Sequence, residues 1–143
     1  MPKRKTVMRA VARARHAWQA YERKNAQKEG VPDSYRTVLM YLLRNPGANQ
    51  RNIAEFAGVT TSAVNQAVKS MLEEDYLRKE VDASDKRNTK LYLTEKGTAV
   101  AENLFAKLDA ADDAITAMIG PEKEAELIGF LEKLADFIRE DLP

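Results

Sequence analysis

The chain is one domain's worth of sequence at 143 residues, with 44% hydrophobic residues, 31% charged residues and a net charge of +1, an ordinary composition for a soluble globular protein. The lack of cysteine excludes disulfides and thiolate metal sites, and a single histidine, His16, argues against a histidine-rich metal sensor. No apolar run reaches the roughly 18 residues of a membrane span, and no signal-peptide core follows the charged N-terminus, so we expect a cytoplasmic protein with no membrane contact, no cofactor and no metal.

The first expected helix runs from about residue 7 to about residue 28, with apolar residues spaced alternately by four and three: Val7, Val11, Ala14, Trp18 and Tyr21. This spacing is a heptad seam, typical of helices that pair along their length. Gly30 and Pro32 end the helix, and Asp33 or Ser34 is the expected N-cap of a second helix that ends at Arg44. The inward residues of this second helix would be Tyr35, Val38, Leu39, Leu42 and Leu43.

Residues 49–58 predict a short third helix, with Asn49 as its N-cap and Gly58 as the left-handed residue just past its end. Thr60 or Thr61 caps the next helix, so about three or four residues join the two, the spacing of a helix-turn-helix. One face of this fourth helix is apolar: Val64, Val68, Met71 and Leu72. The opposite face is neutral to basic, which suits base edges and phosphates, and it consists of Thr61, Ser62, Asn65, Gln66 and Lys69.

A two-stranded hairpin is expected next, because Leu77 and Val81 alternate with polar residues, as do Leu91 and Leu93. The polar turn 82–88 separates the two strands. Helix, turn, helix and hairpin in this order predict a winged helix, so the expected fold class is mainly α with a small β-hairpin wing. We place this winged helix-turn-helix domain at residues 31–108.

Two long helices close the chain. The first is capped by Thr94 and reaches about Ile119, and the last carries apolar residues at spacings of four, three and four: Leu127, Leu131, Leu134 and Ile138. Because the terminal seams need a partner surface, we expect residues 1–30 and 109–143 to form a helical dimerisation region; the alternative is an intramolecular bundle in a monomer. The ends carry net charges of +7 and −7, which favours contact between them over two separate solvated faces.

The hairpin and the residues after it carry a specific pattern. The wing holds Asp82, Asp85 and Arg87 at an Asp-x-x-Asp-x-Arg spacing, and the sequence Leu-Tyr-Leu-Thr-Glu-Lys-Gly follows at residues 91–97. Together with the helix-turn-helix before them, these motifs resemble the MarR family of bacterial and archaeal transcriptional regulators. The resemblance implies a sequence-specific double-stranded DNA-binding regulator, a ligand-responsive repressor that acts as a homodimer on a pseudo-palindromic operator.

The resemblance also implies which residues meet DNA: Asn49, Gln50, Arg51, Thr60, Thr61, Ser62, Asn65, Gln66, Lys69, Asp85, Lys86, Arg87 and Lys90. Asn65 and Gln66 would read adenine edges in the major groove, while Ser62 and Lys69 would meet phosphates. Gln66 stands where many family members carry arginine, which favours an A·T-rich operator. The alternative is that this helix face is merely solvated.

Arg87 is the central residue of the predicted wing. It would enter the minor groove with Asp85 holding its guanidinium in a bidentate pair, while Lys86 and Lys90 follow the DNA backbone. The alternative is a hairpin-tip salt bridge between Asp85 and Arg87 that has no DNA partner.

Members of the family commonly bind a small aromatic or anionic effector, and His16, Trp18, Tyr35 and Arg36 could line such a pocket, although aromatic residues at helical spacing are more often core. The rival function is a winged helix that binds protein and has no operator, which predicts acidic or apolar residues on the outer recognition face. An enzyme is disfavoured, because the sequence lacks a cysteine nucleophile and a Gly-rich phosphate loop.

Overall fold

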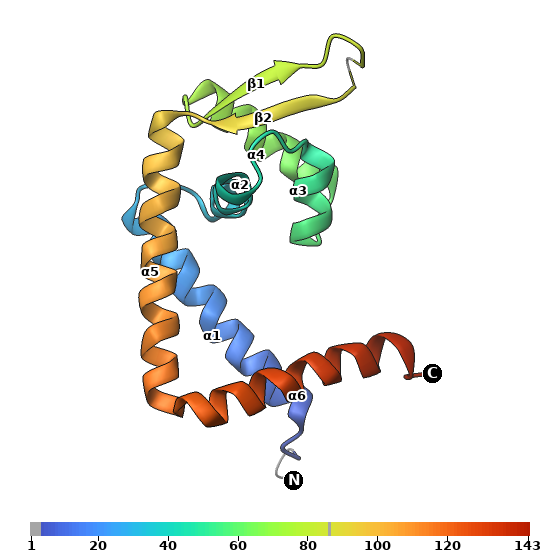
Figure 1. The fold of residues 1–143 in the computed structure, drawn as a ribbon. Coiled ribbons are helices and arrows are strands. Elements are labelled where there is room, and N and C mark those ends of the chain that lie inside the picture. The colour runs from blue at the N-terminus through green and yellow to red at the C-terminus, as the bar shows by residue number, and fades with distance from the viewer. Residues whose placement is uncertain (1–3, 86) are drawn as a thin grey trace. The chain divides into compact units, whose positions relative to one another are not determined.

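The computed structural model describes residues 4–85 and 87–143, which form six helices and one hairpin (Figure 1). In chain order these are α1 (Val7–Lys28), α2 (Asp33–Arg44), α3 (Gln50–Ala57), α4 (Thr61–Glu73), β1 (Leu77–Val81), β2 (Thr89–Leu93), α5 (Glu95–Ile119) and α6 (Pro121–Glu140). The predicted order of helix-turn-helix, hairpin and two long helices is confirmed. The chain divides into two compact units, Met1–Lys107 and Leu108–Pro143.

Helix α2 begins differently from the prediction that Asp33 or Ser34 would be its N-cap. Pro32 occupies the cap position in an extended conformation, and no side chain caps the helix. Asp33 is instead the first helical residue, and its carboxylate accepts a hydrogen bond from Nε of Arg36 at 3.0 Å. The fixed φ of proline supplies the non-helical cap conformation, which leaves Asp33 in the first turn, where a carboxylate complements the helix dipole.

The helix-turn-helix is capped at each predicted point. The Asn49 side chain accepts the backbone N–H of Asn52 at 2.8 Å, and the Asn52 side chain accepts the backbone N–H of Asn49 at 3.1 Å in return. Gly58 ends α3 in the left-handed conformation with φ of +65°, and the Thr60 hydroxyl accepts the backbone N–H of Ala63 at 3.2 Å. These local bonds satisfy backbone groups that the helix ends leave open, so they fix where the turn lies.

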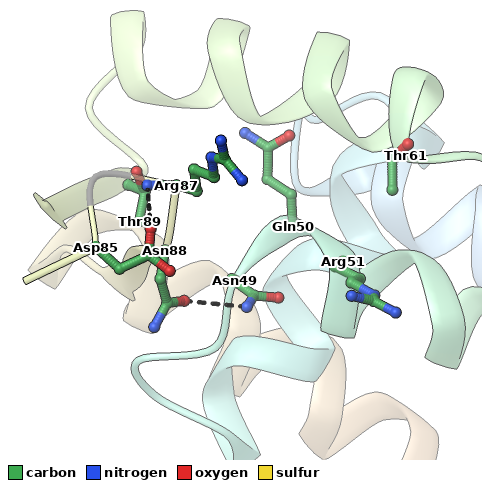
Figure 2. A pocket seen from close by; sticks show the side chains of 8 residues that line it. All are labelled: Asn49, Gln50, Arg51, Thr61, Asp85, Arg87, Asn88 and Thr89. Carbon is green, nitrogen blue, oxygen red and sulfur yellow. Dashed lines mark hydrogen bonds between the residues drawn. The ribbon is translucent and has the colours of Figure 1, made fainter. Parts of the chain in front are cut away.

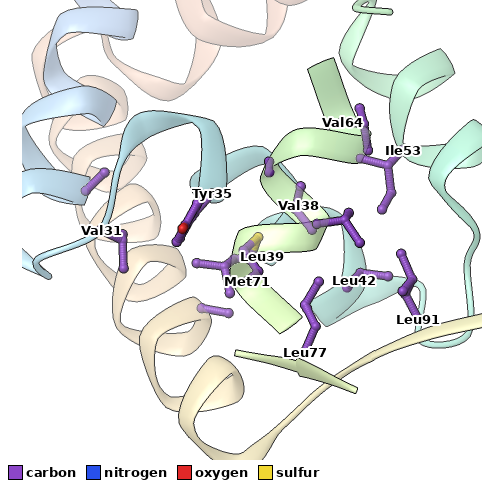
Figure 3. Packing of buried hydrophobic residues seen from close by; sticks show 14 of the residues in the cluster. Val31, Tyr35, Val38, Leu39, Leu42, Ile53, Val64, Met71, Leu77 and Leu91 are labelled. Atoms are coloured by element: carbon purple, nitrogen blue, oxygen red, sulfur yellow. The ribbon is translucent and has the colours of Figure 1, made fainter. Parts of the chain in front are cut away.

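The hydrophobic core of the first unit is built from α2, α3, α4 and the hairpin, together with the last part of α1 and the first part of α5 (Figure 3). Val64, Val68 and Met71 are buried as the apolar stripe of α4 predicted, whereas Leu72 is only partly buried. Ala26 near the end of α1 is fully buried in the same cluster. Helix α4 thus packs against the core through its apolar face, and its polar face points outward.

The hairpin is antiparallel, with Leu77 opposite Leu93 and Val81 opposite Thr89. The segment between α2 and α3 pairs with its second strand: the Gly47 N–H donates to the Leu91 carbonyl at 2.8 Å, and the Leu91 N–H donates to the Ala48 carbonyl at 2.9 Å. Backbone bonds therefore tie the base of the wing to the residues that lead into α3.

The start of α5 is tied to the end of α4. The Thr94 hydroxyl accepts the Gly97 N–H at 3.1 Å, as predicted for the cap, and donates to the Asp75 carbonyl at 2.6 Å. The Thr94 N–H donates to the Tyr76 carbonyl at 3.0 Å. Gly97 is buried so close to this carbonyl that a Cβ at position 97 would overlap the Tyr76 oxygen. Glycine is therefore required here by close approach rather than by backbone conformation.

The second unit contains the end of α5 and all of α6, joined at Gly120, whose φ is +91°. The Thr116 hydroxyl donates to a Glu124 carboxylate oxygen at 2.7 Å, which links the two helices across this turn. Helix α6 has no buried residue, and large apolar side chains along it remain exposed: Leu127, Ile128, Phe130, Leu131, Phe137 and Ile138. Within the described ranges 4–85 and 87–143, none of the helices combines the length and apolar character that a bilayer crossing needs.

Candidate nucleic-acid interface

The outer face of α4 is open to solvent. Its polar residues are all exposed, whereas Val64 and Val68 between them are buried; the exposed set is Thr61, Ser62, Asn65, Gln66 and Lys69. The Thr60 hydroxyl oxygen accepts the Ala63 N–H and so caps α4, while its own O–H is not used in this bond. This face offers amides, hydroxyls and one ammonium, groups that match base edges and phosphates.

The aspartates of the wing organise its own backbone. The Asp82 carboxylate accepts the Ser84 hydroxyl at 2.6 Å and the Ser84 N–H at 2.9 Å, and these bonds hold the pKa of Asp82 below its usual range. The Asp85 carboxylate accepts the Arg87 backbone N–H at 3.0 Å. Short side-chain-to-backbone bonds of this kind shape turns, so the two aspartates set the path of the chain on either side of the loop.

The expected bidentate pair between Asp85 and the Arg87 guanidinium is wrong. Among residues 4–85 and 87–143 none of the ion pairs joins these two side chains, and Oδ1 of Asp85 accepts the Arg87 backbone N–H. The reason is local geometry. A short aspartate side chain readily accepts the backbone N–H two residues further on, and this bond does not require a long arginine side chain to fold back. The Arg87 side chain is left exposed for an outside partner. Lys86 lies outside the described residues.

A hollow of about 590 Å³ separates the wing from the start of α3 (Figure 2). Eight residues from the wing, α3 and α4 line it: Asn49, Gln50, Arg51, Thr61, Asp85, Arg87, Asn88 and Thr89. In Figure 2 the side chains of Arg87 and Gln50 project into the same space from opposite sides. The hollow thus brings six of the predicted DNA contacts to one surface, together with Asn88 and Thr89, which the sequence did not single out.

Asn49 is more occupied than the sequence suggested. Its side-chain oxygen caps α3, and its Nδ2 donates to Oδ1 of Asn88 at 3.1 Å. It was expected to offer an amide donor to a phosphate, and that donor is directed at the wing instead (Figure 2). Arg51 pairs with Glu55 at 3.3 Å, but both side chains are largely exposed, so this pair contributes little and can exchange for a phosphate.

A second hollow, of about 500 Å³, lies beside the outer face of α4 and reaches the first turn of α2. Gln66 and Lys69 line it from the predicted set, and Ser34, Ser70 and Glu73 line it as well. Lys90 is exposed on β2 and takes no part in either hollow. Ser34 could not be found from the sequence as a neighbour of α4, because the two helices meet only in the folded chain.

Three of the four candidate effector residues have partners within the protein. Tyr35 is buried against the ring of Tyr76, and burial, reinforced by Glu74, raises its pKa. Arg36 binds Glu22 at 3.2 Å and Asp33 at 3.0 Å. Trp18 lies against Tyr21, with ring centroids 5.6 Å apart, and His16 is exposed. Tyr35 and Arg36 therefore serve the fold in this state.

Two relatives among transcriptional regulators match much of the chain. The HTH-type transcriptional regulator BilQ of Clostridium symbiosum is 26% identical over 108 residues, which cover 76% of this chain and 75% of that protein. The uncharacterised HTH-type transcriptional regulator YwaE of Bacillus subtilis is 27% identical over 86 residues, which cover 60% of this chain but only half of that protein. A model of the MarR family matches residues 29–88, from the end of α1 to the wing. Over this part of the chain the sequence is similar to the MarR family of transcriptional regulators.

Solved structures of transcriptional regulators share the fold of this chain. The transcriptional regulator SlyA superposes with a TM-score of 0.82 at 20% identity, over 96% of each chain. NadR in complex with 4-hydroxyphenylacetate superposes with a TM-score of 0.75 at 21% identity, over 94% of this chain and 96% of that one. A mutant of Staphylococcus aureus MepR bound to an oligodeoxyribonucleotide gives 0.61 at 18% identity, over 94% of this chain and 99% of that one. The chain thus has the same winged-helix fold as these solved structures.

Proposed function

We propose that this chain is a transcriptional regulator of the MarR family. It would bind a pseudo-palindromic operator sequence-specifically as a homodimer and repress transcription until an effector releases it. The observation that carries the proposal is the hollow that gathers Arg87 from the wing, Gln50 and Arg51 from α3 and Thr61 from α4 on one surface. Asp85 is the one acid among its eight lining residues, and one of its oxygens already accepts the Arg87 backbone N–H. A polyanion can approach such a surface without strong repulsion.

The roles follow from reach and chemistry. The exposed amides of Asn65 and Gln66 can each donate to and accept from an adenine edge in the major groove. Lys69 and Arg51 lie exposed where phosphates would pass, and phosphate contacts fix register without reading sequence. Arg87, unpaired with Asp85, is directed at the minor groove, where narrow A·T tracts attract guanidinium groups.

The homodimer is supported by apolar surface that a single chain leaves in water. Phe130 is 67% exposed, Phe137 is 50% exposed and Leu131 is 41% exposed on α6, and Val7 is 64% exposed on α1. Fully burying one such side chain contributes about 1.5 to 3 kcal/mol, so a handful of them amounts to a substantial driving force. A second copy of the chain supplies a matching apolar surface by symmetry, and two recognition helices then address two half-sites.

Selection of bound sequences from a pool of random duplexes, followed by a salt titration of the winning sequence, tests the proposal. We expect an inverted repeat rich in A·T and a plot of log affinity against log salt with a slope of about −5 or steeper, because about six neutralised phosphates give that value. A pool that shows no enrichment would overturn the operator, and enrichment of single half-sites alone would overturn the dimer.

The effector class we propose is a small aromatic anion that reaches the region of Trp18 and Arg36. Arg36 would have to exchange Glu22 for the ligand, so the ligand would act by breaking an α1–α2 ion pair. Trp18 is the only tryptophan and lies half-buried, so titrating candidate aromatic acids against its fluorescence is a direct test. A ligand that releases operator DNA without changing this fluorescence would place the effector elsewhere.

A further inference from the structure

The described residues of the wing tip, 82–85 and 87–88, are held mostly by hydrogen bonds to one another. The Asp82 and Asp85 carboxylates each bond a group two residues further on, and the Asn88 N–H donates to the Asp85 carbonyl at 3.0 Å. The Asp82 N–H donates to the Asn88 carbonyl at 3.3 Å and closes the turn. These bonds give the tip a shape, but they say nothing about where the tip lies relative to α3.

One bond supplies that missing link. Nδ2 of Asn49 donates to Oδ1 of Asn88 at 3.1 Å across 39 positions of sequence, and the bond is partly buried. Among residues 4–85 and 87–143, no other side-chain-to-side-chain hydrogen bond joins the wing tip to the helix-turn-helix. Partial burial shields the bond from competing water, so its geometry is retained more firmly than that of a surface contact.

Asn49 is suited to this link because an amide has two different ends. Its oxygen is fixed on the Asn52 N–H at 2.8 Å, so its nitrogen must point away from α3 and towards the wing (Figure 2). Serine would cap α3 equally well but would offer no second donor at this distance. Asn88 directly follows Arg87, so the bond fixes the residue next to the wing arginine.

We infer that Asn88, held by Asn49, is a positioning residue that keeps Arg87 in a fixed place relative to α3 and α4, so that wing and recognition helix engage one duplex together. This inference rests on the proposed operator binding. Arg87 is anchored on one side by Asp85 through its backbone N–H and on the other by this amide pair, while its side chain stays exposed. Restricting the tip before binding lowers the ordering cost of the bound state.

A double-mutant cycle tests the inference, with Asn49→Ser, Asn88→Ala and the double variant, each also made with Arg87→Ala. Operator affinity is read by fluorescence anisotropy and stability by urea unfolding. We expect each single variant to lose about three- to tenfold in affinity, the size of one hydrogen bond, and the double variant to lose no more than either single one. In the Arg87→Ala background the same changes should alter affinity by less than about twofold. Asn103→Ala, an exposed amide on α5, is the matched control and should bind normally.

The outcomes are separable. Additive losses, or equal losses with and without Arg87, would overturn the positioning role, and so would an Asn88→Ala variant that binds like the parent. A parent chain that selects no duplex would overturn the operator proposal itself. Loss of affinity that merely follows a lowered urea midpoint would also contradict the inference, because a structural role would then account for it.

Discussion

Replacing Gly97 with alanine sets two physical effects against each other. In a helix interior alanine is favoured over glycine by up to about 1 kcal/mol, so propensity alone predicts a more stable protein. In α5, however, the added Cβ would overlap the main-chain oxygen of Tyr76. That oxygen accepts the Thr94 N–H at 3.0 Å, so it is part of the connection between α4, the hairpin and α5 and cannot shift alone.

The size of the loss follows from these contacts. Inserting a methyl group into a packed position costs about 1 to 3 kcal/mol, and losing the Thr94–Tyr76 hydrogen bond costs about 0.5 to 1.5 kcal/mol more. Subtracting about 1 kcal/mol for helix propensity leaves a net destabilisation of about 0.5 to 3.5 kcal/mol. The steric effect therefore decides the sign, and Gly97→Ala should unfold at a lower urea concentration than the parent.

Gly129 in α6 provides the matched control. Nothing lies within 4 Å of a Cβ built there, and its backbone is helical, so Gly129→Ala should keep only the propensity gain. Urea unfolding of both variants, followed by circular dichroism at one protein concentration, measures the difference. If Gly97→Ala proved as stable as the parent, the close packing of α5 on the end of α4 would be refuted.

Three further outcomes are expected. Arg87→Ala should weaken operator binding by about 1 to 3 kcal/mol with an unchanged urea midpoint, measured by anisotropy at fixed salt; undiminished affinity would remove Arg87 from the interface. Leu131→Glu should shift the sedimenting species from dimer to monomer, whereas Glu132→Ala should not, and a dimeric Leu131→Glu would place the contact elsewhere. The pKa of Asp82 is lower in the folded chain than its usual value of 3.8. The ionised Asp82 carboxylate therefore orders the wing fully above pH 3.8, and this ordering is lost as the pH falls through the lower pKa of the folded chain. The Ser84 amide proton should therefore titrate with a midpoint below 3.8 in NMR spectra, and a midpoint above it would contradict the two Ser84 hydrogen bonds.

The recognition helix could be predicted because its information is local. A 3.6-residue apolar period defined its buried face, and the caps at Asn49, Gly58 and Thr60 lie within a few residues of the helix ends that they fix. The exception was α2, where Pro32 supplied the cap conformation through its ring and two polar candidates next to it were not needed. Backbone restriction and side-chain capping give the same helix start, so the pattern alone could not distinguish them.

The candidate site was predictable as a set of residue types but not as a set of available atoms. Asn49 and Arg36 were assigned to DNA and to an effector, yet Asn49 donates its amide to Asn88 and Arg36 pairs with Glu22. Arg87 showed the reverse, since its expected intramolecular partner turned to the backbone and left it unpaired with Asp85. Which donor is used internally depends on partners as far as 39 positions away, and no local pattern records them.

These distant bonds meet in one short segment. Gly47 and Ala48 pair with Leu91 at the base of the wing, and Asn49 reaches Asn88 near its tip while capping α3. A change in this segment would therefore move the wing relative to the helix-turn-helix. The two could then no longer contact one duplex at the same time, so affinity would fall for every DNA sequence. A change on the outer face of α4, at Gln66 for example, would leave that geometry intact and alter only which bases are preferred. In the proposed complex, the residues that would read the operator are therefore different from those that hold the wing and the helix-turn-helix together.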